Sequence, residues 1–216
     1  MMNLILTLVQ VSIVVPVVFT FARGLYLIYL IYTESCGFND AKQSLRTIFC
    51  VGSGGHTSEL LKLISQMDMQ IYRPRLYIMA DTDNTSETKI IKFENNDNNY
   101  KLSKIPRSRN VNQSFKSSVF STLYAIYVTI PLIYKFNPNL IFCNGPGTCV
   151  PICIVAFIMR CLFLIDCRIV FVESVCRVRT LSLTGNILQF FVDVFVVQWP
   201  QVHKVCFRSK YYGRLT

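Results

Sequence analysis

Apolar residues fill the N-terminal stretch from Leu4 to Ala22 without a charge, and Arg23 follows directly. A helix needs about 20 apolar residues to cross a bilayer, so this stretch is long enough to span a membrane. No small-residue cleavage site follows, which favours a retained anchor over a cleaved signal peptide. The nearest basic residues lie on its C-terminal side, so the positive-inside rule predicts that the rest of the chain faces the cytosol. A buried core helix is the alternative.

After a polar linker at residues 33–46, short apolar runs alternate with segments of helical periodicity. The runs predict strands, and the periodic segments predict helices between them. This alternation is typical of an α/β fold with a Rossmann-like parallel sheet and helices on both faces. Strands are predicted at 47–51, 75–80, 140–143, 169–172 and 194–197, helices at 57–67, 114–134 and 150–164, and loops at 81–86 and 95–99.

The pattern therefore divides the chain into three parts. Residues 1–32 form the membrane anchor with a juxtamembrane segment that contains Tyr26, Tyr29 and Tyr32. Residues 33–46 form a linker, and residues 47–216 form a cytosolic Rossmann-like domain. Within this domain, the apolar segments 119–134 and 149–165 are nearly long enough to span a bilayer. We interpret them as sheet-covering helices, with a second or third membrane crossing as the alternative.

The composition of the chain limits the classes of ligand that this domain is expected to bind. The net charge of +10 fits nucleic acid, an anionic membrane or a phosphorylated substrate. Without a nucleic-acid-binding module or a basic run, the sequence favours membrane and phosphate over nucleic acid. The nine cysteines form no Cys-x-x-Cys pair, and the pair Cys149 and Cys153 has no second pair to complete a metal site. We expect reduced, apolar thiols and neither a metal nor a cofactor.

A glycine-rich turn after the first predicted strand of the domain is the first candidate site. Backbone amides at a helix N-terminus bind anions, and glycines let a phosphate approach closely. The sequence is not a P-loop, because no Gly-Lys-Ser/Thr follows. As a dinucleotide fingerprint it lacks the third glycine, although Asp81 stands where a ribose-binding acid would. A plain turn capped by Thr57 or Ser58 is the alternative. The candidate phosphate-binding residues are Gly52, Ser53, Gly54, Gly55 and Thr57.

His56 lies at the mouth of this turn, where it would face a bound phosphate. Histidine changes its charge near neutral pH, so its imidazole suits proton transfer from a sugar hydroxyl or hydrogen bonding to a phosphate oxygen. A histidine that hydrogen-bonds within its own loop is the alternative. His203 lies in a polar C-terminal stretch, and we expect it to be exposed.

A second glycine-containing loop follows the predicted strand 140–143. In open parallel sheets, ligands bind beyond the carboxyl ends of the strands, so two such loops predict a cleft. Glu173 ends the next strand, where it would orient His56, bind a sugar hydroxyl or cap the following helix. Arg107 and Arg109 would contact phosphate or lie in a solvated loop. The second loop contributes Asn144, Gly145, Gly147 and Thr148.

At this point the motifs resemble a known family, the membrane-anchor subunits of the UDP-N-acetylglucosamine transferase that adds the second sugar to dolichol-linked oligosaccharide. The matches occur in order over nearly the whole predicted domain, and the ordered set is far more specific than any one of them. They are Val51–Thr57, Ala80–Asp83, Ile105–Arg109, Cys143–Pro151, Val172–Ser174, Val197–Pro200 and Tyr212–Arg214.

The resemblance implies the N-terminal half of a GT-B glycosyltransferase fold, which binds a lipid-diphosphate acceptor. A separate soluble subunit would bind UDP-N-acetylglucosamine, and this chain would recruit it to the endoplasmic reticulum membrane and be inactive alone. The acceptor would be GlcNAc-diphosphodolichol, held at the glycine turn with His56 near the attacking hydroxyl and Glu173 as a second catalytic candidate. The C-terminal tail, which would dock the partner, comprises Tyr211, Tyr212, Gly213, Arg214, Leu215 and Thr216.

Two other functions compete with this one. A pure adaptor would recruit a partner that carries out all the chemistry. A membrane-tethered, dinucleotide-dependent oxidoreductase would use Asp81 for a ribose, although the sequence offers no recognisable Tyr/Lys constellation for that chemistry.

Overall fold

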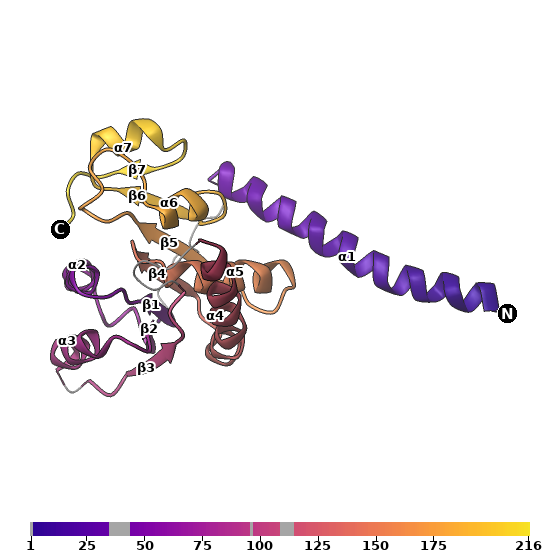
Figure 1. Cartoon of the computed structure of the whole chain (residues 1–216), viewed down its shortest axis with the longest axis horizontal. Coiled ribbons are helices and arrows are strands. Elements are labelled where there is room, and N and C mark those ends of the chain that lie inside the picture. Colours follow the sequence, from indigo (N-terminus) through magenta and orange to yellow (C-terminus); the bar gives the residue numbers. More distant parts are fainter. Residues whose placement is uncertain (1, 35–43, 96, 109–114) are drawn as a thin grey trace.

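The computed structural model describes residues 2–34, 44–95, 97–108 and 115–216 of the chain. Helix α1 (Met2–Tyr32) projects from an α/β body (Figure 1). Its C-terminal part packs on that body, because Leu27 and Ile31 are buried. Exposed apolar side chains cover the segment 14–21. The helix contains an apolar span, Val14–Tyr32, that is long enough to cross a membrane.

The body is built on one seven-stranded sheet whose paired strands are all parallel, in the order β3-β2-β1-β4-β5-β6-β7. This confirms the predicted Rossmann-like sheet. The strand order reverses between β1 and β4, which is the switch point where such sheets bind ligands. The strands are β1 (Thr47–Cys50), β2 (Arg75–Ala80), β3 (Tyr100–Ile105), β4 (Leu140–Asn144), β5 (Arg168–Val172), β6 (Val194–Val197) and β7 (Lys210–Tyr211).

Helices cover both faces of this sheet because the central strands are apolar on both sides. In β1, Ile48 packs into the core beneath one helical layer and Phe49 into the core beneath the other. The first layer contains α4 (Phe115–Phe136), α5 (Cys149–Cys161), α6 (Leu183–Leu188) and α7 (Pro200–Val205), and the second contains α2 (Gly55–Ile64) and α3 (Asn84–Glu94).

The apolar helices α4 and α5 lie on the sheet, in the covering position predicted for them. One face of α4 is buried through Ala125, Thr129 and Ile133, which lie one helical turn apart. The opposite face of α4 carries exposed aromatic and aliphatic side chains. They are Val119, Phe120, Leu123, Tyr124, Tyr127, Ile130 and Tyr134.

The structure corrects the predicted loop at 81–86 and adds a strand that the pattern did not reveal. Helix α3 begins at Asn84, because the Asp83 carboxylate accepts a hydrogen bond from the amide of Ser86 and caps the helix. The polar residues that looked like a loop are therefore a helix start. Strand β3 lies at the sheet edge and is only partly buried, so its apolar signal is weak. The pattern also gave no bounds for α6 (Leu183–Leu188) and no sign of α7 and β7.

Candidate functional site

A pocket of about 410 Å³ lies at the carboxyl ends of the central strands. The loops after β1, β4 and β5 meet there because these strands are neighbours in the sheet. Both glycine loops predicted from the sequence contribute to its wall. The lining comprises Val51, Gly52, Ser53, His56, Ala80, Arg107, Ser108, Gly145, Pro146, Gly147, Thr148, Arg177, Ser182, Leu183 and Thr184.

The first glycine loop leads directly into α2, which begins at Gly55 rather than at the predicted Thr57. Gly54 adopts a positive φ of 63° at the N-cap position, and no side chain caps the helix there. The first amides of α2 are thus free of a side-chain cap, as an anion site requires. Neither Thr57 nor Ser58 is the N-cap.

Four predicted phosphate-binding residues do not line the pocket. Gly54 and Gly55 are exposed beside it. The Thr57 side chain is fully buried and hydrogen-bonds to the Gly52 carbonyl, which fixes the loop from behind. Asn144 is also fully buried, and its side-chain amide donates to the carbonyl oxygen of Val172. Thr57 and Asn144 thus support the site by fixing the backbone around it, and their side chains do not face the pocket.

His56 lies between the two glycine loops. A Cβ atom added to Gly145 would lie 2.9 Å from His56 Cε1, and one added to Gly52 would lie 2.7 Å from His56 Cβ. Gly145 also has a φ of +69°, which disfavours any other residue. The glycines therefore let the backbone of both loops approach the His56 side chain closely. The His56 side chain remains 37% exposed at the pocket wall.

Glu59, which the sequence analysis did not single out, is the carboxylate nearest to this histidine. Its Oε2 lies 3.9 Å from His56 Nδ1, an atom that is buried and has no hydrogen-bond partner among the described residues. Glu59 accepts hydrogen bonds from Ser174 Oγ at 2.9 Å, from the amide of Val175 at 2.7 Å and from Gln198 Nε2 at 2.8 Å. These bonds fix the carboxylate beside the imidazole. The spacing of three residues on one helix face was a signal for this pair.

One role considered for Glu173 was to orient His56, but its carboxylate contacts other groups. Its carboxylate accepts from the amide of Ser174 at 3.0 Å, and from the amide and hydroxyl of Ser182 at 2.9 and 3.0 Å. Ser182 is the N-cap of α6. Burial raises the pKa of Glu173 despite these hydrogen bonds. The contacts agree with the alternative in which Glu173 supports the start of the next helix, and no described contact joins it to His56.

Two guanidinium groups reach the pocket wall. Arg107 Nη2 donates to Ser53 Oγ at 3.1 Å, which ties the predicted phosphate contact to the first glycine loop. Arg177, which the sequence analysis passed over, lies on the same wall. Arg109 lies outside the described residues. Asp81, the ribose-binding candidate, is exposed and does not line the pocket, which removes support from the dinucleotide alternative.

The C-terminal tail is connected to the site by one buried side chain. Gln198 Oε1 accepts from the amide of Leu215 at 3.1 Å and from Thr216 Oγ1 at 3.0 Å. The same side chain donates to Glu59 through Nε2. Two hydrogen-bond steps therefore connect the end of the tail to the carboxylate beside His56. Tyr212 and Arg214 remain exposed.

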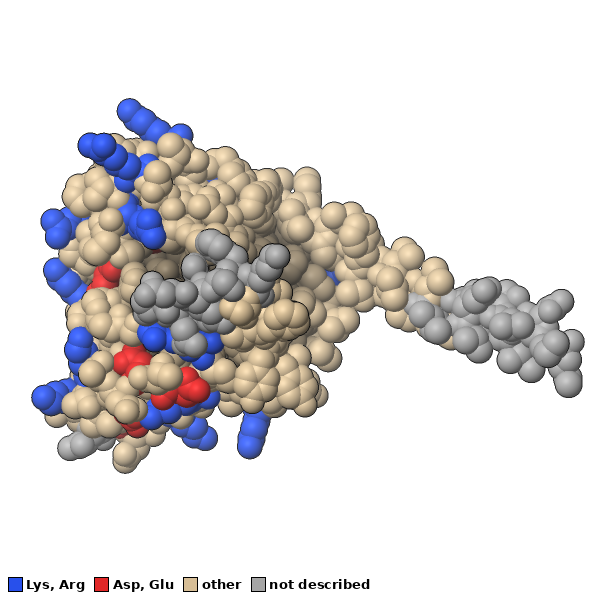
Figure 2. All heavy atoms as spheres, in the orientation of Figure 1, with Lys and Arg blue, Asp and Glu red and all other residues tan. Residues whose placement is uncertain are grey.

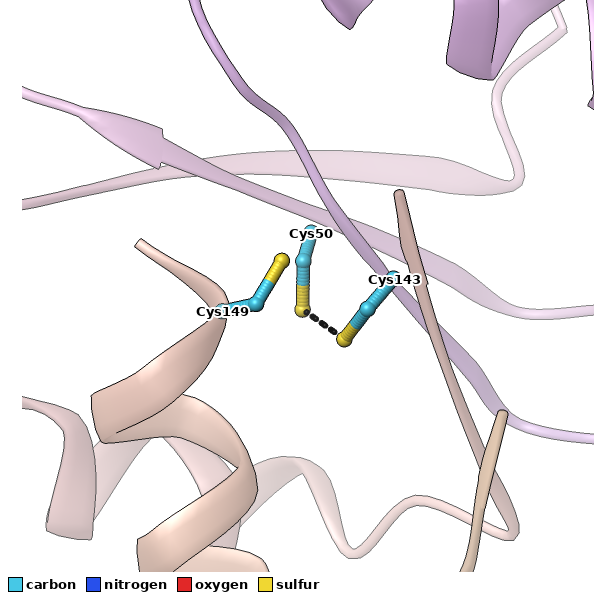
Figure 3. Close-up of side chains that lie close together, drawn as sticks. All are labelled: Cys50, Cys143 and Cys149. Carbon is cyan, nitrogen blue, oxygen red and sulfur yellow. Dashed lines mark hydrogen bonds between the residues drawn. The ribbon is translucent and has the colours of Figure 1, made fainter. Parts of the chain in front are cut away.

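The side chains of Cys50 on β1, Cys143 on β4 and Cys149 at the start of α5 are buried and lie close together (Figure 3). The sulfur atoms of Cys50, Cys143 and Cys149 all lie within 4.8 Å of one another, close enough to share a metal ion. Cys143 Sγ also lies 3.4 Å from Cys153 Sγ. Burial raises the pKa of the Cys50 and Cys143 thiols, which favours the protonated and unreactive form. In that form Cys50 and Cys143 fill the core as small apolar groups. At Cys149, burial is outweighed by hydrogen bonds from Cys143 and Cys50, which lower the pKa of its thiol to about 5.

Solved structures with the same fold define the class. MurG from Acinetobacter baumannii aligns with a TM-score of 0.56 at 14% identity, over 78% of this chain and 45% of MurG. A UDP-N-acetylglucosamine 2-epimerase aligns with a TM-score of 0.52 at 10% identity, over 74% of this chain and 43% of the epimerase. This chain thus spans less than half of either protein, and the likeness concerns the fold. The class is a Rossmann-like domain that corresponds to one half of a GT-B fold.

Sequence comparison then gives the family. The family described as "Oligosaccharide biosynthesis protein Alg14 like" matches residues 47–215. The proteins named UDP-N-acetylglucosamine transferase subunit ALG14 are 46% identical in Rattus norvegicus and 44% identical in Homo sapiens, each over 81% of this chain and 84% of the relative. The Yarrowia lipolytica protein of that name is 41% identical over 76% of this chain and 78% of its own length. This chain belongs to the Alg14 family, which confirms the resemblance found in its motifs.

Proposed function

We propose that this chain is the membrane-anchored, acceptor-side subunit of a UDP-N-acetylglucosamine transferase. In this proposal it adds the second sugar to GlcNAc-diphosphodolichol together with a soluble subunit that binds the sugar nucleotide. One observation carries the proposal: a basic, glycine-walled pocket with His56 opens at the switch point of a half GT-B fold. The names of the relatives, which are all transferase subunits, supply the reaction class.

The diphosphate of the acceptor would occupy the pocket. Arg107 and Arg177 would neutralise its charge at the pocket wall, and the positive end of α2, which begins beside the pocket, would favour the anion. Ser53 holds Arg107 in place for this contact. The pocket thereby positions the sugar of the acceptor near His56.

His56 would act as the general base. As the acceptor hydroxyl oxygen bonds to the anomeric carbon of UDP-N-acetylglucosamine, the bond to UDP breaks and the hydroxyl proton moves to the imidazole. Glu59 would orient the ring and stabilise the cation that forms, in the manner of a carboxylate beside a catalytic histidine. The donor nucleotide would be held by the partner, a proposal supported by the alignment of this chain with only 45% of MurG.

Anchoring and location follow from α1 in this proposal. The apolar span of α1 would lie in the endoplasmic reticulum membrane, and the basic flank at Arg23 would keep residues 47–216 in the cytosol. Residues 1–32 would then form the anchor with its juxtamembrane segment, and 33–46 the linker. The sequon Asn84-Thr85-Ser86 would carry no glycan in this orientation. A glycosidase-sensitive mass shift of the native chain would show that the domain faces the opposite side of the membrane.

The tail from Tyr211 to Thr216 would dock the soluble partner. Its exposed residues, Tyr211, Tyr212 and Arg214, offer aromatic and cationic contacts of the kind that is enriched at interfaces. The hydrogen bonds through Gln198 would transmit docking to Glu59.

Reconstitution tests the proposal. The full chain is placed in membranes with radiolabelled UDP-N-acetylglucosamine and a GlcNAc-diphosphodolichol acceptor, first alone and then with the soluble subunit. We expect transfer only when both chains are present. Transfer by this chain alone would reveal a donor site within it. A complex that assembles and transfers at full rate with His56→Ala would support a pure adaptor instead.

A further inference from the structure

An apolar groove of about 400 Å³ lies between α4, α5 and α6, beside the phosphate pocket. We call it the α4–α6 groove. Its floor and walls are mainly aliphatic, and its few polar side chains are short hydroxyls. The lining comprises Ser108, Ser118, Val119, Thr122, Leu123, Ile126, Gly147, Val150, Ile154, Leu183, Thr184 and Ile187.

The groove and the phosphate pocket share part of their walls. Ser108, Gly147, Leu183 and Thr184 line both. A molecule that places a diphosphate beside Arg107 therefore finds an apolar surface immediately next to it. This juxtaposition fits a ligand that joins an anionic head group to an apolar chain, and it fits a free sugar phosphate poorly.

The groove also opens onto the exposed apolar face of α4. Leu123 lines the groove and is 55% exposed, and Phe120 and Tyr127 on the same helix are 75% and 72% exposed. In Figure 1, α4 and α5 lie on the side of the sheet from which α1 extends. An extended apolar face of this kind is unfavourable in water and favourable against lipid. The groove thus connects the phosphate pocket to the face that would meet the membrane.

We propose that the α4–α6 groove binds the first isoprene units of a polyprenyl chain while the attached diphosphate occupies the pocket. The inference rests on the proposed function and adds a subsite that distinguishes acceptors by their lipid. The pocket for the anion and the aliphatic groove share a wall, so one molecule can fill both. A polyprenyl diphosphate has the two parts that this requires. A helix of the partner subunit is the competing occupant, and the test separates the two.

The test uses the full chain in complex with the soluble subunit, with two acceptors. Both carry GlcNAc-diphosphate, one on a long polyprenyl chain and one on a short, water-soluble alkyl chain. The variant Leu123→Gln/Ile187→Gln makes the groove polar at two partly exposed positions, so the fold should be retained. Ile130→Gln is the matched control, because Ile130 is an exposed apolar residue of α4 that does not line the groove.

We expect the double variant to raise the KM for the long-chain acceptor roughly tenfold, as expected for the loss of a few buried methylene contacts. Its kinetics with the short-chain acceptor should remain unchanged, and Ile130→Gln should leave both acceptors unaffected. An equal loss with both acceptors, no loss with either, or an equal effect of Ile130→Gln would overturn the groove assignment. Loss of the soluble subunit on purification would assign the groove to the partner. Failure of the unaltered complex with both acceptors would contradict the proposed function itself.

Discussion

The two helical layers of the sheet bury similar apolar faces, but their outer faces differ. Outward from α2 and α3 the side chains are mostly polar, as shown by Ser58, Lys62, Lys89 and Lys92. Outward from α4 the face is aromatic and aliphatic. In Figure 2, Lys and Arg gather over the part of the molecule away from α1.

An apolar helix face can either cover the sheet or contact lipid, and the two helical layers differ in which of these roles they show. Both layers cover the sheet, but only the α4 layer needs an apolar environment on its outer side as well. The pocket lies where the layers meet, since β1 leads into α2 and β4 leads into α5. Substitutions at the junction should therefore change the transfer rate. Substitutions on the outer face of α4 should change contact with lipid, and those on the outer surface of the α2/α3 layer should change only stability.

The largest effect is expected at the junction, from His56→Ala. Removing the proposed general base should lower kcat by about 10² to 10⁴ while the complex still assembles. Kinetics of the purified two-chain complex at saturating soluble subunit measure this. His203→Ala is the comparison variant, because His203 lies outside the pocket, where it hydrogen-bonds to Ser209 and stacks on Tyr211. Full activity of His56→Ala would place the chemistry on the partner.

The two glycines of the second loop offer a matched pair. Gly145→Ala should lower activity by about 10²-fold, because its Cβ would displace the His56 ring and the positive φ would be strained. Gly147→Ala should leave the position of His56, and hence kcat, nearly unchanged, since no atom lies within 4 Å of the added Cβ. Because Gly147 lines the pocket, its effect should fall on the KM for the acceptor. Transfer rates and melting temperatures should be compared for both. Equal activity of the two variants would show that the position of His56 does not control the rate.

Glu59→Gln should lower kcat less than His56→Ala does, with little change in the KM for the acceptor. The substitution keeps the shape of the side chain but removes the negative charge beside the imidazole. A positioning role should also shift the pH profile of kcat, which a purely structural role would not. The same pH profile as the unaltered complex would exclude the positioning role.

Lipid contact is tested by adding a tryptophan to each outer face. The added fluorescence of Tyr127→Trp, on α4, should be strongly quenched by brominated lipid in reconstituted membranes, because this side chain is exposed on the apolar face. Lys92→Trp, on α3, should not be quenched, because it faces water. Equal quenching at both positions would show that the α4 layer does not contact lipid more than the α2/α3 layer does.

The smallest effect is expected from Asp83→Ala at the start of α3. Losing the cap should cost about 1 kcal/mol of stability without altering transfer. Burial opposes ionisation of Asp83, but hydrogen bonds from Ser86 and Thr85 outweigh it, so its pKa is lowered on folding. This contribution is therefore present above the ordinary carboxyl pKa and is lost as the pH falls. Thermal melts of the full chain should show the variant and the parent converging in acid, and a constant difference would contradict the ionic cap.

The central features of the fold were predictable because short-range patterns encode them. The buried runs that became β1, β2, β4, β5 and β6 are mostly apolar, and glycine turns mark the carboxyl ends of β1 and β4. Strand β3 escaped notice because only Ile105 is fully buried in it. Helix α3 begins with polar residues whose capping role depends on a three-dimensional contact.

The site was only partly predictable for a similar reason. His56 stands out because glycines surround it, whereas Glu59 is defined by hydrogen bonds from residues far along the chain, Ser174 and Gln198. Thr57 occurs within the motif but points into the core. Arg177 reaches the pocket through the loop after β5 and lies three residues beyond the motif Val172–Ser174. Sequence spacing finds loops, and tertiary packing decides which side chains face the ligand.

Acceptor binding by this chain alone is the most direct test of the central claim. The full chain is reconstituted in lipid nanodiscs, and equilibrium binding is measured for GlcNAc-diphosphate-lipid and, separately, for UDP-N-acetylglucosamine. The account predicts saturable binding of the lipid-linked acceptor, weakened by Arg107→Ala, and no binding of the sugar nucleotide. Binding of the sugar nucleotide without the acceptor would contradict the acceptor-side assignment.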